Sequence, residues 1–204
     1  MGVYQRRILP RLIHLGMRQK QLLPLRERLV ADVRGRVLEV GIGSGLNLPF
    51  YPREVEILLG IDRSRELLEM AQRHASWVHF PVELSEGSAE DIPLEDGAVD
   101  HVVMSWTLCS IADPARALAE IRRVLRPGGS LLFIEHGRAP EPGVARWQDR
   151  LTPVWRTIAG GCHLNRPIDR LIRESGLRLG ELETGYFVKG PRFATYHYRG
   201  RAIA

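Results

Sequence analysis

The segment VLEVGIGSG, residues 37–45, constrains the fold most, because an apolar run ends there in closely spaced glycines. Val37, Leu38 and Val40 are apolar and partly β-branched, which predicts a strand buried on both faces. The glycines let the backbone turn sharply toward the first helix of a nucleotide-binding type of fold. Alternatively, they serve only close packing of helix on strand. They occupy alternate positions: Gly41, Gly43 and Gly45.

The polar residues around this loop indicate what it binds. The GxGxG spacing differs from the GxGxxG dinucleotide fingerprint, and no lysine follows as in a phosphate-binding P-loop. Glu39 directly precedes the loop, and a carboxylate beside a ligand favours a cation over a phosphate. Asp62 ends the next apolar run, about twenty residues on, where an acidic residue binds ribose hydroxyls. The alternative role for Asp62 is to cap a helix expected over residues 64–75.

Several segments in this order resemble the class I S-adenosylmethionine-dependent methyltransferases, from about residue 34 onward. They are VLEVGIGSG, LLGIDRS, GSAEDIPL, VDHVVMSWTLCSI and VLRPGGSLLFIEHG. The resemblance implies an α/β fold: a Rossmann-like seven-stranded sheet, mostly parallel with an antiparallel last strand, and helices on both faces. It implies S-adenosylmethionine as cofactor, its methionine part against the glycine loop and its ribose on Asp62. Many relatives have an aspartate where Ser88 stands, which leaves the backbone at Ala89 as the adenine contact. The implied cofactor residues are Glu39, Gly41, Gly43, Gly45, Asn47, Asp62, Arg63, Ser88, Ala89, Glu90 and Ser105.

Three further segments resemble a narrower group, the small thiol methyltransferases: LNLPFYP, WQDRLTPVW and AGGCHLNRP. Some eukaryotic members have an aspartate where Gly160 stands here, so no role of that carboxylate carries over. The resemblance implies a small apolar acceptor, an alkyl thiol. Two alternatives stay open: methylation of a quinone precursor or phospholipid amine at a membrane, and cofactor binding without turnover. The expected acceptor-side residues are Trp106, Trp147, Trp155, Cys162 and Arg166.

Methyl transfer to sulfur requires mainly alignment and a thiolate, and a free thiol has a pKa near 8.5. His136 follows a strand at the expected ligand-binding edge, so it and His163 are the candidate bases, and Arg166 is a candidate to stabilise the anion. Both histidines also suit purely structural roles. Trp106 either shields the sulfonium or packs in the core. Cys162 with His163 is only a pair, so the sequence predicts no metal site.

The composition of the chain limits its number of domains, its partners and its cellular location. A chain of 204 residues with a net charge of +5 suits one domain and an acidic partner. No nucleic-acid-binding motif accompanies the charge, so an anionic membrane surface is the partner kept open. Two cysteines indicate a reducing cytoplasm, and arginines at positions 6, 7 and 11 argue against a signal sequence. We expect a cytoplasmic protein, peripheral to the inner face of the membrane if lipid is bound.

The single domain divides by pattern into a helical cap (1–33), a cofactor-binding core (34–140), a substrate-side segment (141–175) and a terminal hairpin (176–204). In the cap, Leu12, Ile13, Leu15 and Met17 form one side of an amphipathic helix. That helix has three possible roles: a membrane element, a lid or packing on the sheet. A second stripe, from Leu25, is expected to end at Gly35. Later strands are expected near 77–83, 99–104, 131–134, 177–187 and 193–202.

Overall fold

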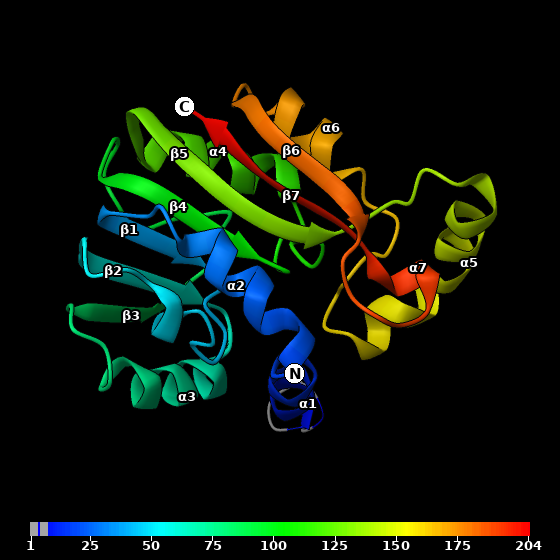
Figure 1. The fold of residues 1–204 in the computed structure, drawn as a ribbon, viewed down its shortest axis with the longest axis horizontal. Coiled ribbons are helices and arrows are strands. Elements are labelled where there is room, and N and C mark those ends of the chain that lie inside the picture. Colours follow the sequence, from blue (N-terminus) through cyan, green and yellow to red (C-terminus); the bar gives the residue numbers. More distant parts are fainter. Residues whose placement is uncertain (1–3, 5–7) are drawn as a thin grey trace.

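The computed structural model describes residue 4 and residues 8–204, and its centre is one seven-stranded sheet of order β3-β2-β1-β4-β5-β7-β6 (Figure 1). Neighbouring strands pair in parallel from β3 to β5, whereas β7 is antiparallel to both β5 and β6. The expected Rossmann-like topology is confirmed. The strands are β1 (Gly35–Val40), β2 (Val55–Asp62), β3 (Val82–Glu86), β4 (Val99–Ser105), β5 (Leu125–His136), β6 (Arg178–Tyr186) and β7 (Tyr196–Ile203).

Helices cover both faces of the sheet, and two apolar clusters fill the layers. On one face, Val37, Leu58 and Val103 join Leu29 of α2 and Leu68 of α3. On the other, the neighbouring strand residues pack against α4 and α6. This alternation follows from the two-residue period of a strand. The helices are α1 (Leu9–Met17), α2 (Leu23–Val30), α3 (Arg65–Ala75), α4 (Pro114–Val124), α5 (Pro142–Ile158), α6 (Ile168–Glu174) and α7 (Arg192–Thr195), with 3₁₀ turns η2 (Lys20–Leu22) and η3 (Leu48–Phe50).

The carboxyl ends of the parallel strands form the ligand-binding edge of this kind of sheet. The glycine loop follows β1 there, and Asp62, Ser105 and His136 end β2, β4 and β5. In Figure 1, α1 lies below this edge, whereas α5 and α7 extend to one side of the sheet. Among the described residues, no helix is long and apolar enough to cross a membrane.

The expected helix after the glycine loop is reduced to the single 3₁₀ turn η3. Pro49 and Pro52 lack the amide hydrogens that an α-helix needs, so the chain leaves helical geometry within one turn. The second helix ends at Val30 and not at Gly35, which instead opens β1 with a φ of 69°. A β-carbon on Gly35 would collide with the Asp100 carboxylate, so the strand requires glycine here.

Other boundaries also differ from the predictions. β3 begins at Val82, because residues 76–80 turn after α3 and leave Trp77 79% exposed. β5 begins at Leu125 and not near residue 131, with an irregularity in its ladder to β4. A short helix, α7, occupies the first residues of the expected last strand. The strand at 99–104 is confirmed as β4.

Candidate active site

The glycine loop and Asp62 form one hydrogen-bonded unit. The loop glycines 41, 43 and 45 have φ of 68°, 55° and 75°. Asp62 accepts hydrogen bonds from the N–H groups of Gly43 and Ser64, each at 2.8 Å. The cap of α3 is Ser64, whose hydroxyl accepts from Leu67 N–H, so Asp62 is not the cap. Burial raises the pKa of Asp62, and the backbone N–H donors oppose that rise.

Behind the loop, Glu39 is fully enclosed and holds other polar groups. Its carboxylate accepts from Asn47 Nδ2 at 2.6 Å and from the Tyr51 hydroxyl at 2.9 Å. Burial raises the pKa of Glu39 to about 7, against the pull of these donors and of Arg26. Asn47 also donates to Ser105 Oγ at 3.0 Å. Glu39 therefore positions Asn47 and links the ends of β1 and β4.

Arg26 of α2 brings a positive charge into this network. It is 3% exposed and donates from Nη1 to Asn47 Oδ1 at 2.7 Å. Burial lowers its pKa to about 10, which still leaves it charged at neutral pH. Its Nε is buried without a hydrogen-bond partner. A buried cation with a free donor beside the glycine loop fits the carboxylate of an amino acid moiety.

Trp106, which follows β4, has its ring face covered by the Arg26 guanidinium carbon, 4.8 Å from the ring centroid. Its φ of 51° is the only positive value among the described non-glycine residues. Backbone strain of this kind often marks functional sites. The cation that Trp106 contacts in this structure is thus Arg26, and its role toward a sulfonium stays a prediction.

The predicted adenine-side loop is held both by its own residues and by residues at and within α4. The Ser88 hydroxyl donates to the Glu90 carboxylate, which also accepts from Asp113 N–H at the start of α4. The bond from Ser88 and the one from Asp113 lower the pKa of Glu90. Ala89 is buried, whereas Arg63 is exposed. These positions leave the backbone around Ala89 as the available adenine contact.

At the ends of β4 and β5 the structure forms a cluster that sequence reasoning missed. One donor atom each of Cys109, His136 and Cys162 lies within 4.8 Å of the other two. Cys162 Sγ is 3.0 Å from His136 Nε2, and His136 Nδ1 is buried without a partner. A hydrogen bond from Cys162 and nearby His136 hold the pKa of Cys109 well below its usual value, against burial. Sequence spacing does not connect Cys109 with the other two residues, and the fold brings the three side chains together.

Glu135 holds the segment that carries Cys109 in place. Its buried carboxylate accepts from the N–H groups of Thr107, Leu108 and Cys109, at 2.7, 2.9 and 3.4 Å. Burial raises its pKa well above the ordinary carboxyl value. The Thr107 hydroxyl approaches the Gly41 carbonyl at 3.5 Å. Residues 107–109 therefore connect the cysteine and histidine cluster with the glycine loop.

The other residues predicted for catalysis or acceptor binding differ in their distance from this cluster. His163 and Arg166 lie at the cluster: Arg166 Nη2 is 3.3 Å from His163 Nδ1, and Nη1 donates to the Leu108 carbonyl. Trp155 is half-buried, and its Nε1 is buried without a partner. Trp147 lies on the exposed side of α5, 57% exposed with Arg150 over its ring, so it is not gathered with the rest.

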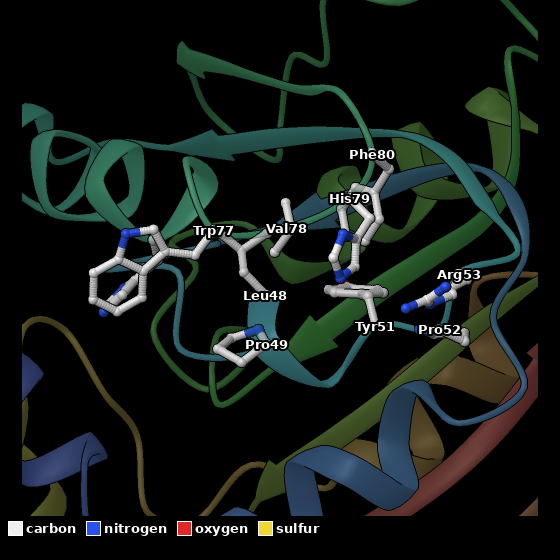
Figure 2. A pocket seen from close by; sticks show the side chains of 10 residues that line it. Leu48, Pro49, Tyr51, Pro52, Arg53, Trp77, Val78, His79 and Phe80 are labelled. Carbon is white, nitrogen blue, oxygen red and sulfur yellow. The ribbon is translucent and has the colours of Figure 1, made fainter.

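A surface cavity of about 300 Å³ lies elsewhere, as Figure 2 shows. Its lining comes from the turn after the glycine loop and from the segment that leads into β3, including Tyr51, Trp77 and Phe80. This cavity is next to the amino ends of β2 and β3. Ligands of open α/β sheets bind at the opposite edge, so we do not assign the cofactor to it.

Sequence reasoning missed Arg26, Tyr51, Cys109 and Glu135. Arg26 interrupts the apolar pattern of a short helix, which is a weak signal because arginines on helices are usually solvated. Glu135 directly precedes His136 at the end of a buried strand. A charged residue at the end of a buried strand is the signal that could have identified it.

Comparisons with known proteins agree with this geometry. Residues 38–133 match the family described as methyltransferase domain. Thiol S-methyltransferase TMT1B of Rattus norvegicus is 37% identical over 149 residues, 67% of this chain and 59% of the relative. Phosphatidylethanolamine N-methyltransferase of Cereibacter sphaeroides is 32% identical over 161 residues, 76% of this chain and 78% of the relative. The chain thus spans less than two thirds of the thiol methyltransferase.

Among solved structures, a chain of the complex between the Haloferax volcanii Trm112 methyltransferase activator and a methyltransferase superposes with a TM-score of 0.73. The overlap covers 98% of this chain and 96% of that one, at 20% identity, which supports the fold alone. Together these findings identify the protein as a methyltransferase. The chain belongs to the class I S-adenosylmethionine-dependent methyltransferases, and S-adenosylmethionine is the cofactor of that family.

Proposed function

We propose that this protein transfers a methyl group from S-adenosylmethionine to the sulfur of a small, apolar thiol. The cofactor, when bound, supplies an electrophilic methyl group on a sulfonium centre. We infer the acceptor class from the two buried carboxylates at the ligand-binding edge, because both already accept hydrogen bonds from the protein. Glu39 accepts from Asn47 and Tyr51, and Glu135 accepts from three backbone N–H groups.

Because these carboxylates are committed to hydrogen bonds, the groups left to assist an acceptor at this edge include the imidazoles of His136 and His163. An imidazole matches the acidity of a thiol far better than that of an alcohol. Arg166 lies beside His163, and its charge suits an anionic sulfur. The relatives named as thiol S-methyltransferases support the same acceptor class.

The cofactor's contacts follow from the unit around the glycine loop. Asp62, fixed by Gly43 and Ser64, is assigned to the ribose hydroxyls. Arg26 and Asn47 are assigned to the methionine end, where the free Nε of Arg26 suits a carboxylate. The backbone at Ala89 is assigned to the adenine. Ser105 and Trp106 then lie between the cofactor and acceptor regions.

A matched set of acceptors tests the proposal directly. The purified protein is incubated with methyl-labelled S-adenosylmethionine and, separately, hexanethiol, hexanol and hexylamine, which share one apolar chain. We expect label in the methyl thioether, and at least about tenfold less in the ether and the methylamine. Equal labelling of the amine, or labelling of the amine alone, would refute thiol specificity.

A matched pair of variants tests the cofactor site. Asp62→Asn keeps the size of the side chain and removes its charge, and we expect affinity for S-adenosylmethionine to fall about tenfold or more. Asp32→Asn, at an exposed position, is the control and should bind like the wild type. Isothermal titration calorimetry measures both. Unchanged affinity in Asp62→Asn would remove Asp62 from the site.

A phospholipid amine is a second candidate acceptor, for two reasons. One relative is named as a phosphatidylethanolamine N-methyltransferase. In addition, the apolar side of α1 is exposed, with Leu12 at 52% and Leu15 at 69%. Exposed leucines on a helix with Arg11 and Arg18 suit an anionic membrane interface. Arginines 6 and 7, part of the same predicted pattern, lie outside the described residues.

Vesicles distinguish the two candidates. If lipid is the acceptor, the double variant Leu12→Gln with Leu15→Gln should lose both sedimentation with anionic phosphatidylethanolamine vesicles and labelling of the lipid, but keep its activity on hexanethiol. Trp77→Gln, which removes an exposed aromatic residue outside α1, serves as control. Lipid labelling that survives the double variant would contradict a docking role of α1.

A further inference from the structure

The cluster of Cys109, His136 and Cys162 combines three chain segments that are far apart in sequence. Cys109 follows β4, His136 is the last residue of β5, and Cys162 lies in the turn after α5. Their donor atoms lie within 4.8 Å of one another. Both cysteines are free thiols and are buried, with 2% and 8% exposure.

The surrounding backbone fixes this arrangement. Glu135 holds the segment that carries Cys109 through three N–H groups. His163 N–H donates to the Cys109 carbonyl at 2.8 Å, which joins the two cysteine segments directly. Arg166 adds a bond to the Leu108 carbonyl. The cluster is therefore preorganised by contacts other than those between its own side chains.

Two thiols and an imidazole are the ligand set that soft and borderline metal ions prefer. Zinc binds Cys and His ligands tetrahedrally, and sites with three protein ligands leave the fourth position to water or substrate. Sulfur and nitrogen donors select against magnesium and calcium, which require oxygen. With both cysteines ionised, the three side chains would neutralise a divalent charge. The cysteines' burial agrees with this, because neutral sites can be enclosed.

We propose that Cys109, His136 and Cys162 bind a zinc ion whose fourth coordination position receives the acceptor thiol. This inference rests on the proposed function for the identity of the acceptor, but not for the metal. On binding, the acceptor sulfur displaces a water molecule and releases its proton to solvent, so the sulfur is held as a thiolate. Coordination then takes over the task that a free imidazole base would perform.

A buried indole N–H, Nε1 of Trp155, lies beside the cluster and is available to a fourth ligand. Trp155 approaches Cys162, and its Nε1–H is buried without an acceptor. His136 Nδ1 is likewise buried and unpartnered, whereas Nε2 faces Cys162. An anionic sulfur at the metal would give the indole N–H a hydrogen-bond partner. The charge of Arg166, beside Cys109's segment, compensates the additional negative charge.

The full-length wild-type protein, produced in zinc-supplemented medium, gives the first measurement. We expect stoichiometric zinc by mass spectrometry, and slow loss of it to a chromophoric chelator. Replacement by cobalt should give a thiolate-to-metal charge-transfer absorption, and added hexanethiol should shift the cobalt d–d bands. A metal-free protein with two titratable thiols and a native circular dichroism spectrum would overturn the site.

Variants identify the ligands. Cys162→Ser and His136→Gln should reduce bound zinc to less than about a tenth of the wild-type content. His79→Gln, an exposed histidine on the far cavity, should keep its zinc. Since Cys162→Ser can impair folding, Cys162→Ala and the cobalt spectrum of the wild type provide independent readouts. Full zinc in both His136→Gln and Cys162→Ala would overturn the assignment.

The experiments can refute the metal site and the acceptor assignment independently of each other. If the protein binds zinc but hexanethiol leaves the spectrum of the cobalt form unchanged, the acceptor does not bind at the fourth position. The metal site itself would still stand. Labelled thioether from fully chelated protein would overturn the metal's role but support the proposed function. Stoichiometric zinc and a thiol-induced cobalt shift, with labelling of hexylamine in place of hexanethiol, would refute the proposed function and leave only the metal-binding part intact.

Discussion

Arg26 covers one face of the Trp106 ring, with 4.8 Å between the guanidinium carbon and the ring centroid. This contact connects α2, which precedes the sheet, to the end of β4 inside it. The same guanidinium donates to Asn47, so one buried charge organises both the aromatic ring and the polar network behind the glycine loop. Arg26 of α2 therefore contributes to the polar network behind the glycine loop.

Arg26→Gln should weaken S-adenosylmethionine binding by about tenfold to a hundredfold, because a charge-assisted hydrogen bond to a carboxylate is lost. Calorimetric titration measures the change. Arg28→Gln, on the exposed side of the same helix, is the matched control. If both variants bind equally well, Arg26 is only a structural support of Trp106.

Glu39 should make stability depend on pH. Its pKa is about 7 in the folded protein, against 4.5 ordinarily, because burial disfavours the charged form. The raised value means that its stabilising contribution is complete below about pH 4.5 and is lost as the pH rises through 7. The Glu39→Gln variant lacks this loss, so relative to it the wild type should lose about 3 kcal/mol across that interval.

Urea denaturation of the two proteins between pH 4.5 and 8 measures this difference. Glu27→Gln, at an exposed position of α2, controls for general loss of charge and should parallel the wild type. A constant difference between wild type and Glu39→Gln over the whole range would show that the carboxyl group does not titrate there.

The loop glycines should separate stability from binding. A β-carbon at Gly41 would collide with the Thr107 side chain, whereas one at Gly43 would meet only the Gly41 carbonyl oxygen, at an ordinary contact distance of 3.9 Å. We expect Gly41→Ala to cost about 2–5 kcal/mol, from overpacking and left-handed backbone strain. Gly43→Ala should cost only about 1–2 kcal/mol.

Gly43→Ala should bind S-adenosylmethionine more weakly than its small loss of stability explains. The reason is that the added methyl group would project into the space assigned to the ligand. Thermal denaturation and titration on the same samples provide the comparison. A Gly43→Ala protein that binds S-adenosylmethionine normally would place the ligand away from this part of the loop.

Ser64 and Asp62 should also have separable roles. Ser64→Ala removes the side-chain cap of α3 and should cost about 1 kcal/mol of stability with unchanged cofactor affinity. Asp62→Asn should show the reverse. If Ser64→Ala impaired binding as strongly as Asp62→Asn, the helix start and the ribose site would not be independent.

Local patterns predicted the elements whose causes are local. The segments at 37–40 and 99–104 identified β1 and β4, because the burial pattern of a strand acts over a few residues. The boundaries that were wrong depend on neighbours in space. Gly35 is needed by Asp100 of another strand, and the helix after the glycine loop is replaced by a turn.

The sequence by itself determined the class of fold and cofactor, since the spacing of the glycine loop, Asp62 and the strands is written along the chain. Only the tertiary structure decided which polar side chains are engaged in hydrogen bonds within the protein and which are available to a ligand. It placed Arg26 against Trp106 and brought Cys109 to His136 and Cys162 across more than fifty residues of chain. The physical reason is that strand order and loop packing juxtapose residues that sequence separation does not relate.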